Sequence, residues 1–169
     1  LTKQSVLSSQ TVVAVPECLP APCFPEIIMK VLGVVTKHEW EDLTDRARNY
    51  LKWITVKAEA IDELAPQPLH TTTRGFELLA IDRDGNSFGE IVERSQELGI
   101  PSVLVRFASL IATFLTVRLL RQQMGRDREV MPSLTFSQNV DANYLNYPRT
   151  LKTLLELFPE YKEMFYFEI

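Results

Sequence analysis

Hydrophobic residues recur at helical spacing over most of this chain, and the longest such pattern runs from residue 36 to residue 64. Thr36 is a suitable helix cap, with Glu39 three residues later, and apolar residues follow at steps of three, four and seven. They are Trp40, Leu43, Ala47, Leu51, Ile54, Ala58 and Ile61. This stripe predicts one long amphipathic helix that ends near Leu64, shortly before two prolines.

The most apolar segment, residues 102–124, predicts a second long helix. Arg106 and Arg118 interrupt it and leave only eleven uncharged residues between them. A membrane-spanning helix needs about 20 predominantly apolar residues. We therefore expect no membrane span here, and we expect this segment to form the buried central helix of the domain.

Shorter helices are expected around this central one. Pro25 suits the first turn of a helix over residues 25–33. A second short helix is expected over residues 87–98, and a third begins at Pro148 and is followed by an aromatic final turn.

Residues 70–82 fit two patterns. The run ELLAI resembles a buried strand, whereas a threonine cap and the spacing of Phe76, Leu79 and Ala80 favour a helix. With a helix here, the sequence predicts an all-α, single-domain helical bundle around residues 102–124. The alternative is an α+β fold with a short strand near residues 76–81.

The N-terminal residues differ in composition from the rest of the chain. Residues 1–24 contain only two charged side chains, Lys3 and Glu17, and three closely spaced prolines. We expect an extended arm over residues 1–24 that lies along the domain or along a neighbouring subunit. A helical domain over residues 25–169 would follow it.

Composition places the chain among globular proteins. It has 169 residues, of which 46% are hydrophobic and 24% charged, enough for one domain with a substantial core. The net charge of −4 argues against a surface devoted to binding phosphate. Cys18 and Cys23 are expected to be free thiols in a reducing compartment, and without a visible secretory signal we expect a cytoplasmic location.

The stretch DRDGNSFGEIVERSQELGIP, which begins at Asp82, allows three interpretations. Carboxylate and amide side chains fall at the ligand spacing of an EF-hand loop, but Ser87 replaces the glycine that such a loop requires. A DNA-binding helix-turn-helix would need a polar recognition helix, whereas the following helix starts with VLVRF. The favoured interpretation is structural: a polar turn precedes a helix that Ser87 and Glu90 start as a capping box.

Residues with catalytic or metal-binding chemistry are few. His38 shares a helical face with Glu41, Asp42 and Asp45, yet negative charges in a first helical turn are favoured by the helix dipole alone. His70 lies beside three threonines and an arginine, and Cys23 has no histidine near it in sequence. We therefore assign no catalytic residue, no metal site and no cofactor.

One basic stretch carries an alternative function. RLLRQQMGRDR contains Arg118, Arg121, Arg126 and Arg128, which could form a patch for nucleic acid or for an acidic partner. Cations in a last helical turn also complement the helix dipole, which is the structural interpretation.

Apolar residues at both ends of the chain indicate a protein partner. The C-terminal residues Phe165, Tyr166 and Phe167 cannot all point inward on one short helix, and the N-terminal arm contains Val12 and Val13. We therefore predict a non-catalytic protein–protein interaction module, an adaptor or regulator that associates with itself. The alternatives are a nucleic-acid-binding regulator and a helical enzyme or small-ligand binder whose site is assembled from scattered residues.

Overall fold

The computed structural model describes residues 23–64, 71–124, 135–139, 142–161 and 165–168. The helices and strands follow in the order α1 (Phe24–Val35), α2 (Lys37–Glu41), α3 (Asp45–Leu51), β1 (Thr55–Leu64), β2 (Thr71–Ile81), α4 (Phe88–Glu97), α5 (Ser102–Met124), β3 (Thr135–Asn139), α6 (Pro148–Leu157) and β4 (Phe165–Glu168). Two 3₁₀ turns, η3 (Ala142–Asn146) and η4 (Pro159–Tyr161), flank α6.

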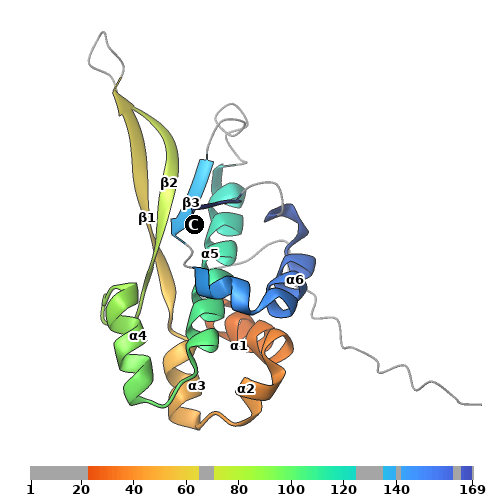
Figure 1. Ribbon diagram of the computed structural model, residues 1–169. Helices are drawn as coiled ribbons and strands as arrows, with labels where there is room; N and C mark the ends of the chain where they lie inside the picture. Colours follow the sequence, from red (N-terminus) through yellow and green to blue (C-terminus); the bar gives the residue numbers. More distant parts are fainter. Residues whose placement is uncertain (1–22, 65–70, 125–134, 140–141, 162–164, 169) are drawn as a thin grey trace, which may run out of the picture.

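Helix α5 forms the centre of the molecule, as the sequence predicts, and α1, α3 and α4 pack around it (Figure 1). Every residue from 103 to 115 is buried, because α5 is apolar on all sides. By length and composition Ser102–Gln123 would pass as a membrane span, but 78% of its most apolar window is buried inside the protein. That burial is the behaviour of a core helix.

Aromatic residues that follow α5 in the chain fold back onto it. The Tyr144 hydroxyl donates a hydrogen bond of 2.9 Å to the Arg106 carbonyl, and the Tyr161 hydroxyl donates to the Phe114 carbonyl. The Tyr161 and Phe114 rings stack with centroids 4.5 Å apart. These contacts join the last third of the chain to the central helix.

A four-stranded sheet in the order β1-β2-β3-β4 accompanies the helices. Strands β1 and β2 form an antiparallel hairpin, while β3 pairs parallel with both β2 and β4. The prediction of an all-α fold is therefore wrong, and the α+β alternative gives the correct class. The strand near residues 76–81 is longer than the alternative supposed, since β2 begins at Thr71.

The predicted helix over residues 36–64 divides into three elements. Helices α2 and α3 account for its first half, with Thr44 accepting a hydrogen bond from the Ala47 N–H at the start of α3. Residues 55–64 form β1, in which side chains alternate between two faces. Ala58 fits the helical stripe as well as the strand alternation of Val56, Ala58 and Ala60, and pairing with β2 selects the strand.

Two further helical predictions are wrong, and three are confirmed. Residues 71–81 form β2 because they pair with β1 and, at residues 75–77, also with β3. The aromatic C-terminal segment forms β4 beside β3 instead of a helical turn. Helices α1, α4 and α6 lie close to where the sequence predicts them, and the arm predicted for residues 1–24 lies, up to residue 22, outside the described residues.

Candidate functional site

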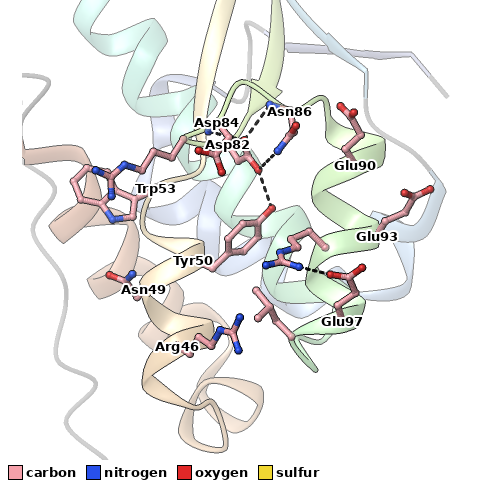
Figure 2. A pocket seen from close by; sticks show the side chains of 13 residues that line it. Arg46, Asn49, Tyr50, Trp53, Asp82, Asp84, Asn86, Glu90, Glu93 and Glu97 are labelled. Carbon is pink, nitrogen blue, oxygen red and sulfur yellow. Dashed lines mark hydrogen bonds and ion pairs between the residues drawn. The ribbon is translucent and has the colours of Figure 1, made fainter.

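A polar cleft of about 460 Å³ lies between α3 and α4, with the turn that follows β2 as its floor (Figure 2). Helix α3 and the residues after it contribute Arg46, Asn49, Tyr50 and Trp53. The turn and α4 contribute acidic side chains and two arginines: Asp82, Arg83, Asp84, Glu90, Glu93, Arg94 and Glu97. We call this space the α3–α4 cleft.

Asp82 is the most connected residue of the cleft and is only 4% exposed. Its carboxylate accepts hydrogen bonds from the Asp84 and Asn86 backbone N–H groups and from the Asn86 side chain, at 2.9–3.0 Å. Burial raises the pKa of Asp82, but the hydrogen bonds from Asn86, Asp84 and Tyr50 outweigh this effect and hold the pKa below its usual value of 3.8. The predicted polar turn before α4 is thus confirmed, and Asp82 is its organising residue.

Tyr50 connects α3 to this turn. Its hydroxyl donates a hydrogen bond of 3.2 Å to Asp82 Oδ2, as the dashed line in Figure 2 shows. Burial, together with the negative charge of Asp82 and this hydrogen bond, raises the pKa of Tyr50 to about 12. The phenol is therefore a neutral hydrogen-bond donor at physiological pH, and it is unsuited to act as a base.

Three further charged residues of the cleft, Glu90, Arg94 and Glu97, also have local partners. Glu90 accepts hydrogen bonds from the Ser87 N–H at 2.7 Å and from its hydroxyl at 2.8 Å, which completes the predicted capping box. These bonds hold the pKa of Glu90 below its usual value of 4.5. Arg94 forms an ion pair with Glu97 one turn later in α4.

The arrangement does not suit a metal ion. Asp82 and Glu90, which an EF-hand would need as ligands, both bind N–H groups of the turn and of the start of α4. Among the described residues, no group of three or more histidine, cysteine or acidic side chains is placed to hold a metal. His38 is exposed on α2, Cys23 is a half-buried free thiol, and His70 and Cys18 lie outside the described residues.

The predicted basic patch is only partly described. The Arg118 guanidinium lies 5.0 Å from the centre of the Phe158 ring, and Arg121 is half-buried. Arg126 and Arg128 lie outside the described residues. Of the two described arginines, Arg118 therefore lies against the C-terminal part of the chain.

The predicted partner-binding residues fall mostly outside the described part. Val12 and Val13 precede it. Phe165, Tyr166 and Phe167 belong to β4, whose backbone pairs with β3, while their side chains are not among the described ones.

An exposed strand edge is the feature that sequence reasoning missed. Strand β1 is the outer strand of the sheet and pairs only with β2 among the described strands. All five residues from Lys57 to Ile61 are exposed, on both faces of the strand, and Ile61 is 42% exposed. We call residues 55–61 the β1 edge. The alternation in TVKAEAI could have revealed it, but Ala58 and Ile61 also fit the helical stripe.

The hairpin continues beyond the part of β2 that β3 covers. Strand β3 pairs with β2 only at residues 75–77, whereas β1 and β2 pair as far as Leu64 and Thr71. Figure 1 shows the hairpin rising away from the helices toward its tip.

A partly exposed tryptophan lies at the base of the hairpin. Trp53 is 40% exposed, between α3 and β1. The Lys52 ammonium lies 5.4 Å from the centre of its ring, and the Arg83 guanidinium lies 5.3 Å away. Both distances are within the range of cation–π attraction.

Comparison of the chain with protein-family models, with curated proteins and with solved structures finds no match. The function therefore has to be inferred from the surfaces of this chain alone.

Proposed function

We propose that this protein is a non-catalytic contact module that associates with a second copy of itself. The observation that carries this proposal is the β1 edge, an outer strand whose residues 57–61 are exposed on both faces. A strand with an open edge offers a row of backbone donors and acceptors to another chain.

The stability of the hairpin supports the same proposal. An isolated two-stranded hairpin is marginally stable in water, and further strands or a covering helix are normally needed. Beyond residues 75–77, where β3 stops pairing, the hairpin has only its own two strands among the described elements. A second copy that pairs along β1 would add two strands to this hairpin.

The chemistry of the α3–α4 cleft favours a contact module over an enzyme. Asp82 and Glu90 bind groups of their own turn and helix start, and Tyr50 donates its hydroxyl to Asp82. A catalytic acid or base normally has a pKa near the working pH, whereas the pKa of Asp82 lies below its usual value and that of Tyr50 is about 12.

Sedimentation velocity over a concentration series tests this proposal. We expect the full chain to change from monomer to dimer at concentrations up to the order of 100 µM, which corresponds to a contact of modest affinity. A chain that sediments as a monomer over the whole series would contradict self-association.

A second candidate function is nucleic-acid binding, and Trp53 is the observation that favours it. Proteins that bind single strands combine cations with aromatic rings on which bases stack, and Trp53 has Lys52 and Arg83 beside it. The net charge of −4 and the acidic residues of the adjoining cleft oppose it. It predicts binding of a labelled single-stranded oligonucleotide that weakens steeply with salt and is lost in Trp53→Ala.

A further inference from the structure

We infer that two copies pair through their β1 edges, antiparallel, across a twofold axis at Ala58. This inference rests on the self-association proposed above and specifies its register. Four properties of the β1 edge carry it: the length of the regular ladder, the order of the charges, the size of the side chains and the exposed Ile61 at its end.

The regular part of the β1–β2 ladder fixes the length of strand that is available. Pairing runs without interruption from Thr55 opposite Ile81 to Ile61 opposite Gly75, and the register then shifts between Ile61 and Asp62. These are seven residues, and Ala58 is the middle one. A twofold axis at Ala58 places all seven opposite a residue of the partner, whereas any other centre leaves residues at one end unpaired.

Charge complementarity selects the same centre. Lys57 and Glu59 lie on one face of β1, since residues two apart on a strand point to the same side. With the axis at Ala58, each Lys57 lies directly opposite Glu59 of the partner subunit, so two opposite-charge pairs form across the contact. An axis at Lys57 or at Glu59 would instead set two like charges against each other.

Lys57 and Glu59 can give up their contact within one copy and pair with the partner subunit instead. Lys57 Nζ lies 2.5 Å from Glu59 Oε1 within one copy, and the two side chains are 58% and 45% exposed. Exposed pairs of this kind contribute little to folding. Both charges can therefore turn from each other toward the partner without loss to the fold.

On the opposite face of β1, the sizes of the side chains also favour an axis at Ala58. There Ala58 meets Ala58 of the partner subunit, and Val56 meets the partner's Ala60. Small residues at the centre leave room for two twisted hairpins to approach each other, and no two large side chains compete for the same space.

The end of the pairing brings an exposed apolar side chain into the contact. The partner's Ile61 would lie opposite Thr55, on the face of β1 that also carries Lys57 and Glu59. The Ile61 side chain is 42% exposed in one copy, and the pairing would cover part of it in each half of the dimer.

Charge reversal and its compensation test the register. The variants are Lys57→Glu, Glu59→Lys and the double exchange, with Lys152→Glu on α6 as a control at an exposed lysine away from the hairpin (Figure 1). The dimer dissociation constant is measured by sedimentation equilibrium on the full chain, and circular dichroism confirms that each variant is folded.

We expect each single reversal to weaken the dimer about tenfold or more, because two attractive pairs become two repulsive ones. The double exchange should return the affinity to that of the wild type, and the Lys152 control should leave it unchanged. A dimeric wild type with unaffected single variants, or with no recovery in the double variant, would overturn this register and leave self-association standing. A monomeric wild type would overturn both.

Discussion

Helix α5 and strand β1 have opposite environments in the same molecule. In α5 thirteen consecutive residues, 103–115, are buried, whereas in β1 five consecutive residues, 57–61, are exposed. The helix gains stability from apolar surface removed from water, at about 25 cal/mol per Å². The outer strand gains little of this, so its stability depends on backbone pairing and on whatever covers its free edge.

This contrast separates two roles. The helices around α5 make a body that is stable by its own core, and the β1 edge is the part that has most to gain from a second chain. Substitutions in the body should act on folding, and substitutions on the β1 edge should act on association.

The largest effect is expected in the core. Phe114 is fully buried and stacks on Tyr161 while packing against Phe158. Phe114→Ala should lower the free energy of unfolding by about 3–5 kcal/mol, measured by denaturant titration. Ile61→Ala on the exposed edge is the matched control, with an expected change within about 0.5 kcal/mol. Equal effects at the two positions would remove the distinction between body and edge.

The next largest effect is expected at the turn between β2 and α4. Asp82→Ala leaves two backbone N–H groups, the Asn86 amide and the Tyr50 hydroxyl without their acceptor, and should cost about 2–3 kcal/mol at neutral pH. Since folding lowers the pKa of Asp82, its contribution is fully present above the usual value of 3.8 and is lost as pH falls through the lower folded value.

Unfolding curves of the wild type and of Asp82→Ala at several pH values test this pH dependence. The difference between their free energies of unfolding should be constant near neutrality and shrink in acid below about pH 4. A difference that grows in acid would mean that Asp82 does not act as a carboxylate acceptor.

A smaller effect is expected at Tyr50. Tyr50→Phe removes one hydrogen bond to Asp82 and should cost about 1 kcal/mol at neutral pH. Folding raises the pKa of Tyr50 from 10.0 to about 12, so its contribution is present below pH 10 and is lost as pH rises toward 12. An absorbance titration of tyrosinate should show one late-titrating tyrosine fewer in the variant than in the wild type.

The smallest effect on folding is expected on the β1 edge itself. Ile61→Glu should leave the free energy of unfolding of the monomer within about 0.5 kcal/mol of the wild type, because Ile61 is already 42% exposed. It should nevertheless weaken the dimer, since it would replace an apolar side chain of the contact with a charged one. Unchanged association in this variant would argue against burial of Ile61.

Elements with strong local signals were predictable from the sequence. The uninterrupted apolar run of α5 and the capping box of Ser87 and Glu90 depend on neighbouring residues only, and both are confirmed. The hairpin was not predictable, because Ala58 fits the helical stripe as well as the strand alternation of Val56, Ala58 and Ala60. The choice of strand over helix depends on the pairing of β1 with β2. This pairing joins residues that are far apart in the chain, such as Ala58 and Leu78.

The candidate surfaces also divide into features that neighbouring residues predict and features that depend on distant contacts. The polar turn at Asp82, Asp84 and Asn86 was predictable from turn chemistry. Its link to Tyr50, 32 positions away in sequence, depends on how α3 packs against the turn. The position of the β1 edge follows from the strand order, which no local pattern reveals.

Hydrogen–deuterium exchange of the β1 edge as a function of protein concentration tests the central claim most directly. Every second backbone N–H group of residues 55–61 points away from β2 and exchanges freely in a monomer. We predict that these N–H groups become protected as concentration rises through the dimer dissociation constant, while those of α5 stay protected throughout. A dimer that forms without any change of exchange in residues 55–61 would contradict the account.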